Sequence, residues 1–66
     1  MDFNIQVKEI RSKLNLSQTE FSKTFNIPLR SIQNWEQGYR SPDTATKSYL
    51  KIISEDPEMV KYLLEK

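Results

Sequence analysis

The fold of this 66-residue chain is decided by residues 17–38, which read SQTEFSKTFNIPLRSIQNWEQG. Ser17 and Glu20 have the spacing of a capping box, in which each side chain accepts a hydrogen bond from the backbone amide of the other. A helix therefore begins directly after Ser17. Phe21 and Phe25 follow four residues apart, which places both on one apolar face of that helix.

A tight turn and a second helix come next. Asn26 tolerates the left-handed conformation that ends a helix, and Pro28 suits the first position of a new one, where its missing N–H is not needed. Ile32 and Trp35 lie three residues apart, so we interpret Trp35 as a core residue rather than as a stacking surface for a base. Gly38 ends the second helix. This order of helix, tight turn and helix predicts a helix-turn-helix motif.

The remaining sequence predicts three further helices. The first has an apolar face formed by Phe3, Val7, Ile10 and Leu14. Asp43 and the Asp56-Pro57 pair are start signals for the last two helices. The fourth helix is predicted to bury Ala45, Tyr49, Ile52 and Ile53. The five predicted helices cover about residues 3–14, 18–25, 28–37, 44–54 and 57–65, which makes the fold all-α, with a single domain over residues 1–66.

The composition argues against several kinds of site. The sequence has no cysteine and no histidine, which excludes disulfides, cysteine nucleophiles, histidine bases and most structural zinc sites. It also lacks a glycine-rich phosphate loop and a paired-carboxylate pattern, so we expect no enzyme, no metal and no cofactor. Nothing resembles a signal peptide or a membrane span, and we expect a cytoplasmic protein. The formal net charge is only +1, but residues 1–41 carry six basic side chains against four acidic ones.

Residues 17–38 and the segments around them resemble the Cro/C1-type (XRE) helix-turn-helix family. The likeness lies in Leu16-Ser17-Gln18, Glu20-Phe21, Asn26-Ile27, Ser31-Ile32 and Trp35-Glu36-Gln37-Gly38 followed by Pro42, and it covers about residues 5–60. Residues 49–53 and 56–58 resemble, more weakly, the ends of short antitoxin-like members. Asn26, Ser22 and Pro28 depart from the glycine, alanine and serine that the family commonly has at these positions. The resemblance implies a five-helix lambda-repressor-like domain that binds DNA as a bacterial or phage transcriptional regulator.

In such a motif the second helix enters the major groove, so its outward side chains read bases. Arginine can bind guanine through two hydrogen bonds, and asparagine or glutamine can bind adenine in the same way. We therefore expect Arg30 and Asn34 to read bases, with Gln33 as a third candidate. Leu29 is a candidate for contact with a thymine methyl group. The alternative interpretation is that these are ordinary solvated residues of a helix surface.

Other residues are candidates for phosphate contacts or for holding the motif in place. The resemblance implies that Gln18 contacts phosphate, while Ser17 caps its helix and adds affinity for an anion together with the helix amides. Arg40 follows the second helix and is either a phosphate contact or an unassigned surface residue. The resemblance also implies a structural ion pair between Arg11 and Glu36, with two parallel hydrogen bonds. The alternative for that pair is two solvated charges.

The expected partner is double-stranded DNA with inverted-repeat half-sites, bound by a homodimer. Candidates for the dimer interface on the last helix are Met59, Val60, Leu63 and Leu64. These side chains alternatively complete the core or bind a different protein. Three functions remain open: a dimeric repressor that reads the major groove with helix 28–37, an antitoxin that binds a toxin protein and also represses its operon, and a protein-interaction module with the same fold and no specific DNA binding.

Overall fold

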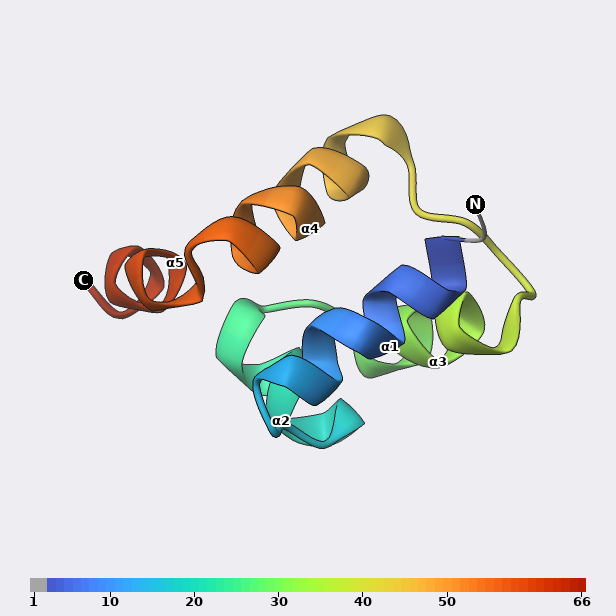
Figure 1. Ribbon diagram of the computed structural model, residues 1–66, viewed down its shortest axis with the longest axis horizontal. Coiled ribbons are helices and arrows are strands. Elements are labelled where there is room, and N and C mark those ends of the chain that lie inside the picture. Colours follow the sequence, from blue (N-terminus) through green and yellow to red (C-terminus); the bar gives the residue numbers. More distant parts are fainter. Residues whose placement is uncertain (1–2) are drawn as a thin grey trace.

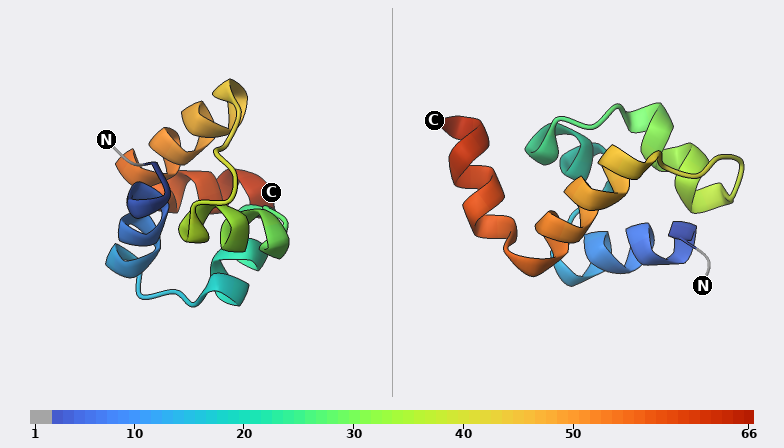
Figure 2. Two further views of the ribbon diagram at one scale, coloured as in Figure 1. Left: turned by 90° about the vertical axis from the view of Figure 1, so that its right-hand side faces the viewer. Right: turned by 90° about the horizontal axis from the view of Figure 1, so that it is seen from above.

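The computed structural model describes the backbone of residues 3–66 and the side chains of residues 7–66. The described chain contains five α-helices and no strand: α1 (Phe3–Lys13), α2 (Gln18–Phe25), α3 (Leu29–Gln37), α4 (Thr44–Glu55) and α5 (Pro57–Glu65). In Figure 1, α4 lies above α1, while α3 packs on another side of α1 and α2 packs against α3 and α5. α5 stands at the end of the molecule away from the end of α3 (Figure 2). The all-α, five-helix fold predicted from the sequence is confirmed.

The first helix of the motif and the turn after it are built by short-range hydrogen bonds. The Ser17 hydroxyl accepts from the Glu20 amide at 3.1 Å, and the Glu20 carboxylate accepts from the Ser17 amide at 2.8 Å. Asn26 has a φ of 57° and ends α2 in the left-handed conformation. Ser22 then closes the turn, because its carbonyl accepts from the Ile27 amide and its hydroxyl donates to the Ile27 carbonyl. The capping box and the left-handed asparagine were both predicted.

α3 begins one residue later than predicted. Pro28 was expected at the first helical position, but its φ of −57° and ψ of 133° place it at the N-cap, and Leu29 is the first helical residue. The fixed φ of proline fits either position, so the extended ψ decides between them. The Pro28 carbonyl accepts from the amides of Ser31 and Ile32, as an N-cap carbonyl does. Gly38 ends the helix with a φ of 81°.

The core gathers apolar side chains from all five helices. Its buried members are Val7, Phe21, Phe25, Ile27, Ile32, Trp35, Leu50, Ile53 and Val60. Only 8% of Trp35 is exposed, which agrees with its interpretation as a core residue. Ile10 and Leu14 of the predicted α1 stripe pack against this cluster and are partly buried. The side chain of Phe3, the first residue of that stripe, lies outside the described residues.

The predicted inner face of α4 is partly wrong. Ile53 is fully buried and Tyr49 is half-buried, but Ala45 is exposed and Ile52 is 55% exposed. Leu50, which the prediction left out, has no exposed surface. The error arises because residues 50, 52 and 53 are all apolar, so two different helical stripes fit the sequence. The packing of α4 against α1 and α5 selects the stripe that contains Leu50.

Two polar contacts cap the starts of α4 and α5, and a third joins α4 to α2. Asp43 accepts from the Thr46 amide at 2.8 Å and Asp56 accepts from the Met59 amide at 3.1 Å, so both predicted caps are present. The Tyr49 hydroxyl donates to the Phe25 carbonyl at 2.7 Å, a contact that the sequence analysis did not anticipate. Burial raises the pKa of Tyr49. The Phe25 carbonyl lies in the last turn of α2, where carbonyls lack helical partners, so Tyr49 satisfies it and joins α4 to the motif.

Within residues 3–66, no helix has the length and apolar character needed to cross a membrane.

Candidate nucleic-acid interface

α3 has a buried face and a polar face that points away from the core. Ile32 is fully buried on the inner side. Successive residues of a helix are about 100° apart, so Arg30 and Asn34, each two residues from Ile32, lie on the opposite side. Arg30 and Gln33 are exposed, and Asn34 is half-buried. A guanidinium and two amides therefore share one accessible face, and the half-buried Leu29 lies beside its start.

The loop after α3 folds back onto the helix end. The Asn34 carbonyl accepts from the amides of Gly38, Tyr39 and Arg40, the last at 3.4 Å. These bonds hold the exposed Arg40 beside the last turn of α3. Arg30 and Arg40 are thus two exposed cations carried by α3 and its loop.

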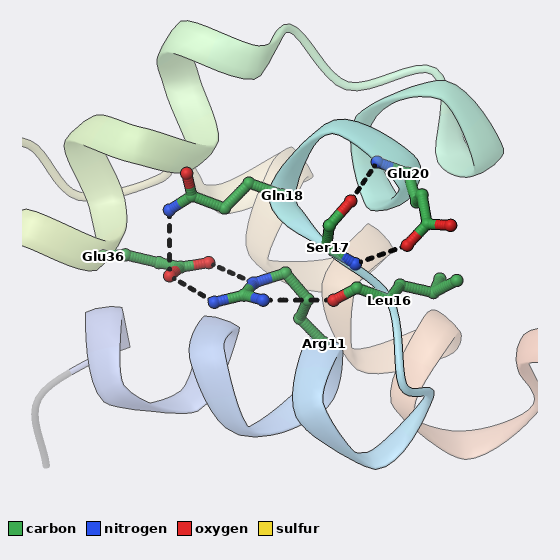
Figure 3. A network of polar contacts seen from close by, with 6 residues as sticks. All are labelled: Arg11, Leu16, Ser17, Gln18, Glu20 and Glu36. Carbon is green, nitrogen blue, oxygen red and sulfur yellow. Dashed lines mark hydrogen bonds and ion pairs between the residues drawn. The ribbon is translucent and has the colours of Figure 1, made fainter.

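Arg11 and Glu36 form a bidentate ion pair that joins α1 to α3 (Figure 3). The Arg11 Nε donates to Glu36 Oε2 at 2.8 Å, and Nη2 donates to Oε1 at 2.9 Å. The remaining nitrogen, Nη1, donates to the Leu16 carbonyl at 3.0 Å, in the loop before α2. Only 16% of the Arg11 side chain and 6% of the Glu36 side chain are exposed. One guanidinium therefore connects α1, the loop before α2, and α3.

Gln18 extends this network to α2. Its Nε2 donates to Glu36 Oε1 at 3.2 Å, as Figure 3 shows. This bond was not predicted: the resemblance implied a phosphate contact for Gln18. The signals for it were a polar side chain in the first turn of α2 and a carboxylate on α3 with an expected partner on α1. The amide has a second N–H and a carbonyl oxygen, so contact with Glu36 leaves groups of Gln18 available for another partner.

The ion pair also neutralises the one carboxylate of α3. Burial alone would raise the pKa of Glu36, but the hydrogen bonds from Arg11 and Gln18, with the positive charges of Arg11 and Lys8, outweigh it and lower the pKa. The hydrogen bond to Glu36 raises the pKa of Arg11 in turn, despite its desolvation. Both groups are consequently charged at neutral pH. A carboxylate that would otherwise repel a polyanion beside α3 is screened by its own partner.

The N-terminus of α2 lies on the same network. Ser17 is exposed, and its hydroxyl accepts from the Glu20 amide while keeping its own hydrogen to donate. The Glu20 carboxylate caps the Ser17 amide, and this hydrogen bond lowers the pKa of Glu20. Part of the anion-binding capacity of this helix end is therefore already used by Glu20. Among the described residues, no group of histidine, cysteine, aspartate or glutamate side chains is arranged to hold a metal ion.

The candidate interface residues of α5 divide into two groups. Val60 is 6% exposed and belongs to the core. Met59, Leu63 and Leu64 are 51%, 58% and 39% exposed, and Tyr62, which the sequence analysis did not name, is 61% exposed. Completion of the core thus explains only Val60. The other four are exposed apolar side chains of α5, at one end of the molecule.

Comparison with known proteins assigns this geometry to a family. Residues 7–46 match the helix-turn-helix family. Antitoxin HigA-2 of Vibrio cholerae is 28% identical over 60 residues, which are 91% of this chain and 58% of that protein. The HTH-type transcriptional regulator ImmR of Bacillus subtilis is 35% identical over 66 residues, the whole of this chain and 50% of that protein. The chain thus spans about half the length of these relatives. No solved structure matches it significantly.

The matched region includes the whole of α2, the turn and α3, which form the polar face and its supports. It also includes Arg11 and Glu36. The family assignment therefore rests on the same residues as the geometry, and it agrees with the resemblance read from the Trp-Glu-Gln-Gly segment. The chain belongs to the helix-turn-helix family of the Cro/C1 type, whose members are DNA-binding proteins and not enzymes.

Proposed function

We propose that the protein is a sequence-specific transcriptional regulator that represses its target by inserting α3 into the major groove of DNA. The observation that carries this proposal is the polar face of α3, held in place by the network around Glu36. Base readout through paired hydrogen bonds needs a fixed donor geometry. A helix attached to α1 and α2 by three hydrogen bonds to one carboxylate meets that need.

In this proposal Arg30 and Asn34 read bases, because they combine exposure with side chains suited to guanine and adenine. Gln33 is a third reader, and Leu29 contacts a thymine methyl group at the start of the helix. Residues in the first turns of a recognition helix lie deepest in the groove, which favours Arg30 as the strongest determinant.

Phosphate contacts come from both sides of α3. Ser17 and Gln18 lie at the N-terminus of α2, where hydroxyl, amide and backbone N–H groups can donate to a phosphate. Arg40 is exposed beside the other end of α3. In this proposal it contacts the phosphate backbone of DNA there. These contacts position the protein on DNA without reading its sequence.

The test is selection of binding sites from random-sequence duplex DNA at two salt concentrations. Wild type is compared with Arg30→Ala, Arg40→Ala and Lys51→Ala, the last a charge-matched control at an exposed position of α4. We expect wild type to enrich an inverted repeat. Arg30→Ala should weaken binding by about 1–3 kcal/mol and relax the preference at one base pair. Arg40→Ala should weaken binding to all sequences and reduce the salt dependence, with a slope smaller by about one.

Weak, salt-sensitive binding without any enriched sequence would mean phosphate contacts alone. That result would contradict the repressor and favour a protein-interaction module with the same fold. An equal effect of Arg30→Ala and Lys51→Ala on the selected sites would instead contradict the proposed role of Arg30.

We further propose that the protein binds its operator as a homodimer through α5. One recognition helix covers only a few base pairs, and two-fold half-sites are about 34–36 Å apart. The exposed Met59, Tyr62, Leu63 and Leu64 supply an apolar surface for a second copy. Because Leu63 is 58% exposed, Leu63→Glu should leave the fold intact.

The dimer is tested by analytical ultracentrifugation over a range of concentrations. Leu63→Glu should shift the protein to monomer and abolish the preference for an inverted repeat over a single half-site. Glu65→Lys, also on α5 but not apolar, is the control. A wild type that stays monomeric on its selected DNA would contradict the dimer.

A second candidate function, an antitoxin, is favoured by the similarity to antitoxin HigA-2. In that case the protein binds a toxin and represses the operon that encodes both. Expression of the neighbouring gene alone should then arrest growth, and co-expression of this chain should restore growth and copurify the two products. A neighbouring product that is harmless or does not copurify would exclude this function and leave the repressor.

A further inference from the structure

A groove lies between α1 and α4. Its volume is about 550 Å³, and its apolar floor comes from Ile10 and Leu14 of α1 and from Leu50 and Ile53 of α4. α1 and α4 lie side by side in Figure 1 and, from a second direction, in the right-hand view of Figure 2. Neither the polar face of α3 nor the exposed surface of α5 contributes to the groove.

The groove lies on the side of α1 away from α3. Arg11, which pairs with Glu36 of α3, marks the side of α1 that faces the motif. Glu9 and Lys13 line the groove, and each is two residues from Arg11, about 200° around the helix. A molecule in the groove therefore approaches from a different direction than DNA bound at α3.

The shape of the groove favours anchoring side chains over an enclosed small molecule. Leu50 and Ile53 have no surface accessible to water, so the reachable apolar surface comes from the partly buried Ile10 and Leu14 and from lysine stems. Small-molecule sites enclose most of their ligand. A groove between two helices instead matches the mode in which an amphipathic helix inserts a few apolar side chains.

The rim of the groove is basic. Lys13 stands on the α1 wall and Lys51 on the α4 wall, and both are exposed. Lys47 also lines the groove, and Glu9 is its one acidic member. Within the described residues, neither Lys13 nor Lys51 takes part in an ion pair. Cations on both helices that line an apolar groove complement a ligand that has carboxylates on both sides of an apolar stripe.

We propose that this groove docks an acidic amphipathic helix of a partner protein. The apolar stripe of that helix packs on Ile10 and Leu14, and its aspartate or glutamate side chains pair with Lys13 and Lys51. Docking leaves α3 accessible, so the same molecule binds the partner and DNA at the same time. The docking itself does not depend on the proposed repressor function.

The probe is a displayed library of helical peptides with leucine fixed at i, i+3 and i+7 and the other positions randomised. Selection is carried out on the full 66-residue chain. The peptides that emerge are titrated into the labelled protein and followed by amide chemical shifts. Affinities are measured for wild type, for Lys13→Glu/Lys51→Glu, and for Lys23→Glu/Lys66→Glu, which makes the same charge change at exposed positions outside the groove.

We expect selected peptides rich in aspartate and glutamate, with shifts concentrated on facing residues of α1 and α4. The groove variant should lose at least about tenfold in affinity and the control less than about threefold. Circular dichroism should show that both variants are folded, because all four lysines are exposed.

Any of four results would overturn the proposal. These are the selection of peptides that are not acidic, the failure to select any peptide, chemical-shift changes that map to α5, and an equal loss of affinity in the two variants. Sodium decanoate is titrated in parallel as a small amphiphilic anion. If it shifts the groove amides while no peptide does, the groove is a small-molecule site and the docking proposal is wrong.

Discussion

Replacement of Glu36 by alanine should destabilise the whole domain. The variant loses both hydrogen bonds from Arg11 and the one from Gln18. It also leaves the Arg11 guanidinium, only 16% exposed, with the Leu16 carbonyl as its remaining partner. Breaking a buried pair by removing one side costs about 3–5 kcal/mol, because an uncompensated charge stays behind. Since Arg11 keeps one acceptor and some solvent, we expect the lower end, about 3 kcal/mol.

That loss is large for a chain of 66 residues. Total stability is about 0.05–0.15 kcal/mol per residue, or roughly 3–10 kcal/mol here. The melting temperature should fall by about 12–24 °C, since each kcal/mol shifts a domain of this size by about 4–8 °C. The assay is urea unfolding at neutral pH, followed by far-UV circular dichroism, with wild type and variant compared by their midpoints at equal slope.

Glu58→Ala is the matched control, because it removes a carboxylate from an exposed ion pair. The Glu58–Lys61 pair spans 3.3 Å, with 80% and 41% of the side chains exposed. Such pairs contribute about 0–1 kcal/mol. Arg11→Ala completes a double-mutant cycle with Glu36→Ala, and the double variant should cost little more than either single one. If Glu36→Ala costs no more than Glu58→Ala, the pair does not hold α3 and our reasoning about the scaffold is wrong.

Three further predictions concern pH and single hydrogen bonds or turns. The pKa of Glu36 in the folded protein lies below its ordinary value of about 4.5, so its contribution to folding stability is full above that value and is lost as the pH falls through the folded pKa. The difference in stability between wild type and Glu36→Ala should therefore narrow in urea titrations taken toward about pH 3. A difference that stays constant with pH would contradict this. Tyr49→Phe should lower stability by about 1 kcal/mol, through loss of the bond to the Phe25 carbonyl, and an unchanged urea midpoint would show that bond to be unimportant. Asn26→Gly should match or exceed wild type in melting temperature, whereas Asn26→Ala should cost about 1 kcal/mol, because residue 26 has a φ of 57°; the opposite order would contradict a conformational origin.

Much of the motif was predictable from the sequence because its signals are local. Ser17 and Glu20 satisfy each other's amides within one turn of helix, and Asn26 and Gly38 mark the two left-handed residues that end α2 and α3. Each of these features depends on residues close in the chain. The prediction failed by one residue at Pro28, whose fixed φ is compatible with two adjacent positions.

Features set by contacts between distant elements were harder to predict. The buried stripe of α4 includes Leu50 and leaves out Ile52 because of where α1 and α5 lie, and periodicity alone contains no such information. The bond from Gln18 to Glu36 spans 18 residues of sequence, and the bond from Tyr49 to the Phe25 carbonyl spans 24. No spacing rule within a single helix could predict either bond.

The order Trp35-Glu36-Gln37-Gly38 shows how one short segment separates the support of α3 from the proposed contact of that helix with DNA. Consecutive helical residues point in directions about 100° apart. Trp35 is therefore buried in the core, Glu36 faces Arg11, and Gln37 is exposed to solvent, while Gly38 ends the helix. The depth, rotation and length of α3 are fixed by residues outside its polar face. Arg30→Ala should consequently alter sequence preference while changing stability by less than about 0.5 kcal/mol, the usual limit for exposed sites. A comparable loss of stability in Arg30→Ala and Glu36→Ala would show that the residues proposed to read bases also hold α3 in place.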